Sequence, residues 1–270
     1  MSKPNLYFVY GGLGKQIAFT AIINGLYEQE KNKICIGSSL YPVFKYHPKV
    51  VRQFLYDNSF LTDTSHYHYK KYKNIICGEP YNSNFLKGDT HLIDSFAELY
   101  GVKEYKKEPD LYINEQLEKK LKSEIIKLNK FIIVQFQGGE SNIKEINRGY
   151  NYGQEVVDIL KNKYPFMNIL NYRLEHQPKI VGCLEMPQEN YESFMVYAKY
   201  CSTFISIDSS LMHMCSNRHF NKKGVCLWGV SSPKMFGYEK NINIRSDYPD
   251  SSEIDPKLIV ENIERILDGE

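Results

Sequence analysis

Two short apolar runs enclosing a polar turn and a helical stretch, all within Phe204–Gly237, constrain the fold more than any other part of the sequence. The runs Phe204–Ile207 and Val225–Trp228 have the apolar character of strands that are buried on both faces of a sheet. Asp208-Ser209-Ser210 follows the first run, and these residue types favour the start of a helix. The segment therefore predicts two parallel strands joined by a helix, as in an α/β protein.

The same segment predicts an anion-binding pocket. Ligands of open α/β sheets bind at the carboxyl ends of the strands, where the first amides of a helix favour negative charge. The predicted helix Leu211–Asn217 carries His213 in its opening turn, and the small-residue loop Gly229–Pro233 follows the second strand. A phosphate group is the natural ligand of such a pocket.

Strands and helices alternate through the rest of the chain, which is the pattern of a doubly wound α/β protein. We predict further strands at Leu6–Tyr10, Ile34–Ile36, Asn74–Cys77, Phe131–Gln137, Asn168–Leu170 and Lys179–Val181. We predict further helices at Gln16–Gln29, Val50–Leu55, His91–Tyr100, Asn114–Asn129, Gly153–Lys163, Gln188–Tyr200 and Asp255–Leu267. Gly101 suits the C-cap of one helix, and Pro256 suits the first turn of another.

The alternation indicates two Rossmann-like halves, and 270 residues are enough for two modest domains. The composition turns charged around Lys103–Asp110, where Pro109 interrupts the pattern. We place the boundary near residues 103–130 and define an N-terminal domain at 1–125 and a C-terminal domain at 126–270, with the last helix free to pack back on the N-terminal domain. The net charge of +2 neither indicates nor excludes a nucleic-acid partner.

The six cysteines are scattered without a CxxC pair or the spacing of a metal finger. Most of them lie in apolar or helical stretches, so we expect buried, reduced thiols and a cytoplasmic protein. No apolar run approaches the roughly 20 residues that a membrane span needs, and the N-terminus leads directly into a strand. We expect no signal peptide and no transmembrane segment.

The stretches Ile207–His213 and Leu227–Pro233 resemble glycosyltransferase family 9, the heptosyltransferase-like enzymes. That family carries a strand, the motif Asp-Ser/Thr-Gly-x-x-His, a helix, an apolar strand and a loop like Phe-Gly-x-Thr-x-Pro. The turn Gly11-Gly12-Leu13-Gly14 is similar to its N-terminal Gly-Leu-Gly-Asp turn. His91–Pro109 lies where the family has a helix, a Gly and a Pro, and Phe131–Gly139 is similar to the strand and loop that open its donor domain.

The resemblance implies a compact GT-B architecture, in which two Rossmann-like domains face each other across a cleft. It implies a nucleotide-sugar donor on the C-terminal domain and an acceptor on the N-terminal domain. It also implies a metal-independent glycosyltransferase with no permanently bound cofactor, whose co-substrate is an ADP- or UDP-linked sugar. Helix amides and cationic side chains would then neutralise the departing diphosphate.

On this basis we assign donor binding to two groups of residues. One is the loop after the Phe131 strand, where Lys144 and Arg148 are alternative cations for the diphosphate. The other is the turn and helix that begin at Asp208. The full donor set is Gly138, Gly139, Lys144, Arg148, Asp208, Ser209, Ser210, Leu211, Met212 and His213.

The catalytic base is open, because Lys15 stands where the family turn has the Asp that is proposed to activate the acceptor. A lysine is a poor base unless burial depresses its pKa. Either the base lies elsewhere, or the mechanism differs, or catalysis has been lost. Our catalytic candidates are Lys15, Asp94 and His213, and the other candidates for the base are Asp63, His66, His68 and Glu79.

The acceptor candidates are Gly12, Gly14, Lys15, Gln16, His66, His68 and Lys70. The strip His66–Lys73 interleaves basic and aromatic side chains, so it is either a surface for a polyanion or a sugar, or an exposed loop. We expect no metal site at its His-x-His pair, since no Cys or carboxylate partner stands at a recognisable spacing. By resemblance the acceptor is a surface glycan such as a lipopolysaccharide core, with peripheral membrane contact, and the strip keeps a modified base in DNA as a second possibility.

Two other functions fit the same phosphate pocket. A nucleotide-sugar 2-epimerase of GT-B fold would need no acceptor surface. A non-catalytic nucleotide-sugar binder would fit the loss of the aspartate at Lys15.

Overall fold

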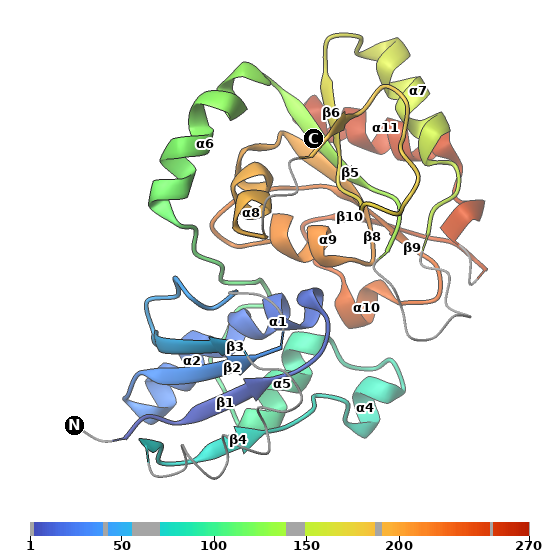
Figure 1. Cartoon of the computed structure of the whole chain (residues 1–270). Helices are drawn as coiled ribbons and strands as arrows, with labels where there is room; N and C mark the ends of the chain where they lie inside the picture. Colours follow the sequence, from blue (N-terminus) through green and yellow to red (C-terminus); the bar gives the residue numbers. More distant parts are fainter. Residues whose placement is uncertain are drawn as a thin grey trace. The chain divides into compact units, whose positions relative to one another are not determined.

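The structure is a computed structural model that describes residues 3–39, 43–55, 71–138, 149–186, 191–248 and 251–269. The chain divides into two compact units, Met1–Asn114 and Glu115–Glu270. Each unit is built on its own parallel sheet flanked by helices (Figure 1). Helix α6 (Glu115–Lys127) opens the second unit, and the domain boundary predicted at residues 125 and 126 lies within this helix.

The first unit contains a four-stranded sheet with the order β3-β2-β1-β4, in which all the neighbouring strands are parallel. Its elements are β1 (Leu6–Val9), α1 (Leu13–Phe19), η1 (Thr20–Ile22), α2 (Ile23–Glu30), β2 (Ile34–Ser38), β3 (Val50–Leu55), β4 (Ile75–Cys77), α4 (Ser83–Leu86) and α5 (Leu92–Tyr100). The two strands that flank β1 lie on opposite sides of it, so the direction in which strands are added reverses between β1 and β4.

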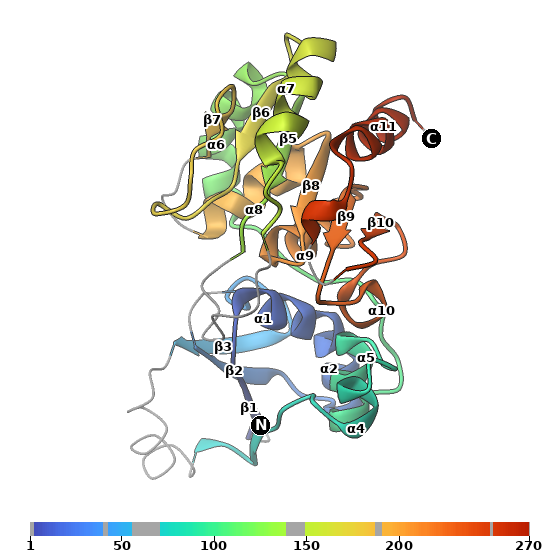
Figure 2. The same cartoon turned by 90° about the vertical axis from the view of Figure 1, so that its right-hand side faces the viewer.

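Helices α1, α2 and α5 lie on one face of this sheet (Figure 2). Their core is aromatic: the ring of Phe19 makes edge-on contacts with Phe44, Phe96 and Tyr100, at centroid distances of 5.9, 5.2 and 5.8 Å. Edge-to-face pairs of this kind stabilise a core beyond the area they bury. The core therefore fixes α1 and α5 beside the sheet. As predicted, α5 ends at Gly101, which has a positive φ of 66°.

The prediction of a helix at Val50–Leu55 was wrong. This segment is strand β3, which pairs with β2 in parallel register, Ile36 opposite Gln53. Gln53 reinforces the pairing, because its Nε2 donates to Ser38 Oγ at 2.6 Å and its Oε1 accepts from the Phe44 amide at 3.0 Å. The consecutive valines Val50 and Val51 favour a strand, and sheet pairing with a distant segment outweighed the local helical spacing.

The second unit contains a six-stranded parallel sheet with the order β10-β9-β8-β5-β6-β7. Its elements after α6 are β5 (Phe131–Gln135), α7 (Gly153–Lys163), β6 (Asn168–Asn171), β7 (Leu184–Glu185), α8 (Tyr191–Tyr200), β8 (Thr203–Ile207), α9 (Ser210–Cys215), β9 (Val225–Trp228), α10 (Pro233–Phe236), β10 (Ile242–Arg245), η3 (Ser251–Glu253) and α11 (Pro256–Leu267). Numbered from β5, the spatial order is 3-2-1-4-5-6, which is that of a Rossmann sheet. The direction in which strands are added to the sheet therefore reverses between β5 and β8.

Helices α7 and α11 cover one face of this sheet, and α6, α8 and α9 cover the other (Figure 1). One hydrophobic core lies under α7 and α11 and draws alternate residues from the strands, among them Ile132, Val134, Ile205 and Ile207. Side chains that alternate along a strand point to opposite faces, so Gln135 and Ser206 lie on the α8 and α9 side. This alternation decides which polar groups can approach the start of α9.

Most of the predicted elements of the second unit are confirmed, and Pro256 opens α11 as expected. The strand predicted at Lys179–Val181 was wrong. The strand is Leu184–Glu185, and a turn with Gly182 at a φ of 85° precedes it. Strand β10 and the short helices α4 and α10 were not predicted, because each is only four residues long and shows little periodicity.

All six cysteines are free thiols. The expectation of buried thiols is confirmed for Cys35, Cys201, Cys215 and Cys226, whereas Cys77 is exposed and Cys183 is half-buried. Within the described ranges, no helix combines the length and the apolar character that crossing a bilayer requires.

Candidate functional site

The first group of candidate residues lies where the strand order reverses in the second sheet, between β5 and β8. Open α/β sheets bind their ligands at the carboxyl ends of the strands at this point. Gln135 at the end of β5 is in register with Ser206 near the end of β8. The chain leaves β8 through Asp208 and enters α9 at Ser210. The motif that was singled out in the sequence therefore begins at the topological switch point of a Rossmann sheet.

The turn Asp208-Ser209-Ser210 is half-buried, and Ser209 is the N-cap of α9. Its side chain makes no capping hydrogen bond, although capping is the commonest use of serine at this position. The structure therefore argues against a purely structural cap. Burial, and after it the negative charge of Asp208, raises the pKa of the Cys226 thiol, so Cys226 stays protonated below the turn.

His213 lies on α9 and is 4% exposed. Its Nδ1 is 2.6 Å from the hydroxyl of Tyr238, and the two rings meet edge-on with centroids 5.6 Å apart. Tyr238 is itself buried and lies in the segment between α10 and β10. The contact fixes the orientation of the imidazole ring, as a second residue often does for a functional histidine.

Two asparagines hold the segment that carries Tyr238. Asn241 Nδ2 donates to Ser216 Oγ at 2.8 Å, just after α9, and its Oδ1 accepts from the Gly224 amide at 3.2 Å. Asn243 Oδ1 accepts from Trp228 Nε1 at 2.9 Å, and its Nδ2 donates to the carbonyl of Tyr238 at 3.2 Å. Buried networks that are satisfied in this way make a segment rigid, so Tyr238 is held in place opposite His213.

Gly138 follows β5 and is held by Gln177, whose Nε2 donates to the Gly138 carbonyl at 2.5 Å. Arg173 organises this neighbouring loop: its Nη1 donates to the carbonyls of Leu174, Glu175 and Gln177 at 2.7–2.9 Å. Its Nη2 pairs with Glu185 on β7 at 2.9 Å. Hydrogen bonds and an ion pair thus connect the chain segments at the carboxyl ends of β5, β6 and β7.

Gln135 is a candidate that the sequence reasoning missed. It is buried, its Nε2 donates to the Gln137 carbonyl at 3.3 Å, and its Oε1 finds no hydrogen-bond partner within the described part of the chain. A buried acceptor without a partner is costly unless a ligand or water satisfies it. A polar residue that ends the apolar strand FIIVQ was the feature that could have identified it.

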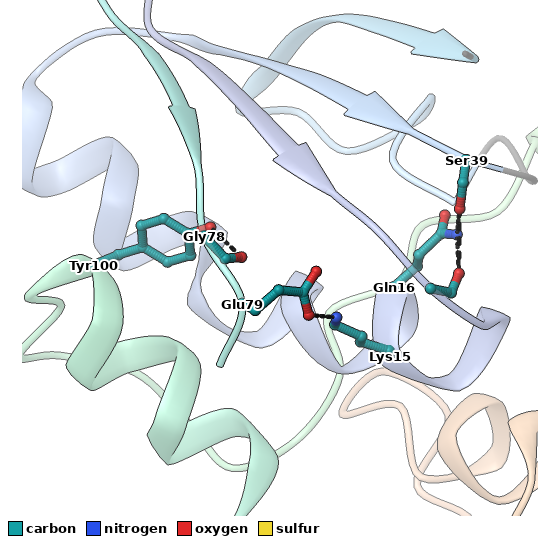
Figure 3. Close-up of polar contacts among 7 residues, drawn as sticks. Lys15, Gln16, Ser39, Gly78, Glu79 and Tyr100 are labelled. Atoms are coloured by element: carbon teal, nitrogen blue, oxygen red, sulfur yellow. Dashed lines mark hydrogen bonds and ion pairs between the residues drawn. The ribbon is translucent and has the colours of Figure 1, made fainter. Parts of the chain in front are cut away.

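The second group of candidates lies at the corresponding point of the first sheet, between β1 and β4. The turn Gly11–Gly14 leaves β1, and Gly78 and Glu79 leave β4. Lys15 on α1 forms an ion pair with the Glu79 carboxylate (Figure 3). Its Nζ also lies 4.6 Å from the ring centroid of Tyr81. Lys15 is therefore engaged with a carboxylate and an aromatic face.

Gln16 holds the glycine turn on the other side of Lys15 (Figure 3). Its Nε2 donates to the Gly11 carbonyl and to Ser39 Oγ, both at 3.0 Å, and Ser39 Oγ donates in turn to the Gly11 carbonyl at 3.2 Å. Gly12 is the N-cap of α1, and a Cβ added there would meet no atom within 4 Å. The turn is therefore braced from within, with open space at Gly12, while Gly14 lies in the first turn of α1.

Asp94, the third catalytic candidate, lies in the first turn of α5. Both of its oxygens are engaged, Oδ1 by the Tyr105 hydroxyl at 2.8 Å and Oδ2 by Lys107 Nζ at 2.7 Å. Burial, followed by the hydrogen bond to Asp94, raises the pKa of Tyr105 to about 12. The contacts tie the chain after α5 to the helix, and a catalytic role for Asp94 stays a prediction.

Several predicted site residues lie outside the described ranges, namely Asp63, His66, His68, Lys70, Gly139, Lys144 and Arg148. The choice between Lys144 and Arg148 therefore stays open. Leu211 and Met212 are described, and their side chains belong to the buried core, so only their backbone groups are available to a ligand. Among the described residues, no group of three or more His, Cys, Asp or Glu side chains is arranged to hold a metal ion.

The structure thus assembles the predicted residues in two places. In the second unit, Gly138 and the turn from Asp208 to His213 belong to the carboxyl ends of β5 and β8. In the first unit, the glycine turn, Lys15 and Gln16 join Glu79 at the carboxyl ends of β1 and β4.

No family model matches the sequence, and no curated protein matches it. Solved structures match the fold over nearly the whole chain. A glycosyl transferase of family 9 from Veillonella parvula is 15% identical, with a TM-score of 0.77 over 99% of this chain and 98% of that chain. The E. coli ADP-heptose LPS heptosyltransferase II is 13% identical, with a TM-score of 0.74 over 98% of both chains. The E. coli heptosyltransferase WaaC with ADP is 9% identical, with a TM-score of 0.68 over 97% of this chain and 99% of that chain.

The chain has the GT-B fold. This confirms the predicted fold class, and it confirms the resemblance to glycosyltransferase family 9 at the level of the fold. Within the GT-B fold, the two parallel sheets each contribute one switch point, and every described candidate site residue except Asp94 belongs to one of them. The ligands of these residues remain predictions.

Proposed function

We propose that this chain is a glycosyltransferase that moves a sugar from a nucleoside-diphosphate donor to a hydroxyl acceptor. One observation carries the proposal: the turn from Asp208 to Ser210 leaves β8 at the switch point of a Rossmann sheet, in a chain whose fold matches glycosyltransferases from end to end. The fold alone would not decide the activity, because one fold hosts many functions. The residues at the switch point supply the chemical argument.

The turn of the second unit is proposed to bind the diphosphate. Ser209 and Ser210 have hydroxyls and amides suited to phosphate oxygens, and the Ser209 hydroxyl is not used as a cap. His213, oriented by Tyr238, is proposed to donate to a phosphate or sugar oxygen. Lys144 or Arg148 would add a cation. These groups would stabilise the charge that develops on the departing diphosphate, without a metal ion.

The donor is proposed to be an ADP-linked sugar, with a UDP-linked sugar as the second choice. Two structural neighbours are described as an ADP-heptose heptosyltransferase and a heptosyltransferase with ADP, which supports adenine. The acceptor is proposed to be a hydroxyl of a cell-surface glycan, assembled in the cytoplasm where nucleotide sugars are made. The strip His66–Lys73 is the reason to include a modified DNA base among the acceptors tested.

The test is a nucleotide-release assay with ADP- and UDP-sugars, each with a lipopolysaccharide-core acceptor, with hydroxymethylated DNA, and without acceptor. We expect ADP release that requires an acceptor, with product detected by mass spectrometry. Conversion of the donor to an isomeric sugar without acceptor would instead support the epimerase, and donor binding without turnover would support a non-catalytic binder.

The variant His213→Ala tests the site itself. We expect it to lower kcat/KM by about 10²-fold, the order seen when one donor to developing negative charge is removed. His219→Ala is the matched control, because His219 is exposed and lies outside the proposed site. Equal activity of the two variants would remove His213 from the donor site, and circular dichroism would show that both remain folded.

A further inference from the structure

We propose that Glu79 is the residue that takes the proton from the acceptor hydroxyl, and that Lys15 positions it. The inference rests on the proposed glycosyltransferase function and adds the missing base. The sequence resemblance predicts a carboxylate at residue 15, where this chain has lysine. The structure brings a carboxylate to the same edge of the sheet from another strand (Figure 3).

The position of Glu79 in the fold is the first argument. Strand β4 is the neighbour of β1 on the side where strand order reverses, and Phe8 near the end of β1 is in register with Cys77 at the end of β4. Glu79 follows two residues later, opposite the turn that leads into Lys15. Functional residues of open α/β sheets concentrate at the carboxyl ends of the strands at such a point.

The two side chains of the Lys15–Glu79 ion pair differ in how far they are exposed to solvent, and this is the second argument. The Lys15 side chain is 10% exposed, whereas that of Glu79 is 44% exposed. The Lys15 stem lies against Gly11, where a Cβ would come within 3.1 Å of Lys15 Cδ, and Gly11 has a φ of +93° that favours glycine. Lysine is thus enclosed by the turn and by the Tyr81 ring, while the carboxylate faces outward, where a hydroxyl can reach it.

The support beneath Glu79 is the third argument. Gly78 packs on α5 so closely that a Cβ there would lie 2.9 Å from a Leu99 methyl carbon. The Tyr100 hydroxyl donates to the Gly78 carbonyl at 3.4 Å. Burial, together with the nearby Cys77 and Glu79, raises the pKa of Tyr100 to about 12, so the phenol remains a donor at neutral pH. The backbone before Glu79 is therefore fixed by α5.

Asp94 is the other described carboxylate among the candidates for the catalytic base, and it differs in its contacts. Tyr105 and Lys107 engage both of its oxygens, and its side chain is 21% exposed. Of the Glu79 carboxylate, only Oε2 makes a hydrogen bond or ion pair within the described part of the chain. A general base must approach the proton that it removes to hydrogen-bond distance, which favours the accessible carboxylate.

A Glu79 oxygen accepts the proton of the acceptor hydroxyl, and the hydroxyl oxygen uses its lone pair to form a bond to the anomeric carbon of the donor. The bond between that carbon and the diphosphate oxygen breaks, and its electron pair leaves with the nucleoside diphosphate. Protonated Glu79 then returns the proton to water. Lys15 holds the carboxylate in position through the ion pair, and does not itself touch the reacting atoms.

The experiment compares Glu79→Gln, Glu79→Asp and Lys15→Met with wild type in the acceptor-dependent release assay, alongside ADP binding by calorimetry. We expect Glu79→Gln to lower kcat by 10²- to 10⁴-fold, the usual contribution of a general base. Glu79→Asp keeps a carboxylate, so we expect it to retain at least tenfold more activity than Glu79→Gln. Lys15→Met loses only the positioning, and we expect about a tenfold fall in kcat with the acceptor KM little changed.

The control variant is Glu28→Gln, because Glu28 also pairs with a lysine in the same unit but is exposed on α2. It should leave kcat and ADP affinity unchanged. A Glu79→Gln variant within threefold of the wild-type kcat, or one whose loss lies wholly in ADP affinity, would overturn the assignment of Glu79 while leaving the transferase function standing. A wild type without acceptor-dependent release would instead contradict the transferase function, and the base with it.

Discussion

His213 shows how this fold fixes the orientation of a single side chain. The imidazole is almost fully buried, and its Nδ1 is occupied by the Tyr238 hydroxyl. A hydrogen bond at one ring nitrogen fixes the direction of the whole ring, which is the way in which functional histidines are usually oriented. Tyr238 depends in turn on Asn241 and Asn243, which hydrogen-bond its segment to Ser216 after α9 and to Trp228 at the end of β9.

The variant Tyr238→Phe removes only the hydroxyl. We expect it to weaken ADP binding by about fivefold, because the loss of one hydrogen bond costs about 1 kcal/mol and lets the imidazole turn. Calorimetric titration with ADP measures the change. Tyr248→Phe is the control, since Tyr248 is exposed after β10. If the two variants bind ADP equally well, the Tyr238 hydroxyl does not orient a donor ligand.

Many of these contacts between single residues could not be predicted from the sequence. The resemblance identified His213 and the turn at Asp208 by their spacing. Tyr238 was missed because it is 25 residues further along the chain and no local pattern distinguishes it from the other tyrosines. Glu79 was named only as one of several acidic or basic candidates, because its ion pair with Lys15 joins residues 64 positions apart.

At the scale of elements, the segment after α5 is fastened to α2 by close packing and by a buried carboxylate. A Cβ on Gly25 of α2 would lie 2.3 Å from Val102 Cγ1 and 2.5 Å from the Glu104 carbonyl, so only glycine allows this approach. Asp110 Oδ2 accepts from Asn24 Nδ2 at 2.6 Å and lies 3.2 Å from His47 Nε2. The Lys49 amide donates to His47 Nδ1 at 3.2 Å, so the proton of the neutral ring is on Nε2, facing Asp110.

Replacing Asp110 tests this fastening. We expect Asp110→Ala to lower the free energy of unfolding of the first unit by about 3–5 kcal/mol, because its polar partners would remain buried without their acceptor. Urea unfolding followed by tyrosine fluorescence and circular dichroism measures the change. The exposed Glu28→Ala variant should change it by no more than about 1 kcal/mol. A similar effect of both substitutions would show that the Asp110 contacts do not stabilise the unit.

Helices and strands were predicted well where several features of the sequence indicate the same structure. They were predicted poorly where only one feature does. Helix α7 has a strong apolar period, and its predicted bounds Gly153–Lys163 match the structure. Strand β9 is uniformly apolar, and its predicted bounds also match. Val50–Leu55 was assigned to a helix because its spacing suits both states, and only pairing with β2 decides for a strand.

At the scale of the whole molecule, the same reversal of strand order occurs in both sheets. Each parallel sheet reverses its strand order next to its first strand, and at each reversal a turn of small residues leads into a short helix. The alternation of strands and helices predicted two such sheets, and the fold confirms them. The strand order itself could not be predicted, because the pairing of β8 beside β5 depends on contacts between segments about 70 residues apart.

The most direct test of the central claim is a crystal structure of the protein with bound ADP. The account predicts diphosphate at the carboxyl ends of β5 and β8, with phosphate oxygens within about 3 Å of the amides or hydroxyls of Ser209 and Ser210. That result would show that the diphosphate of the donor binds at the switch point of the second sheet. A diphosphate bound anywhere else on the chain, with the turn from Asp208 to Ser210 unoccupied, would contradict the account.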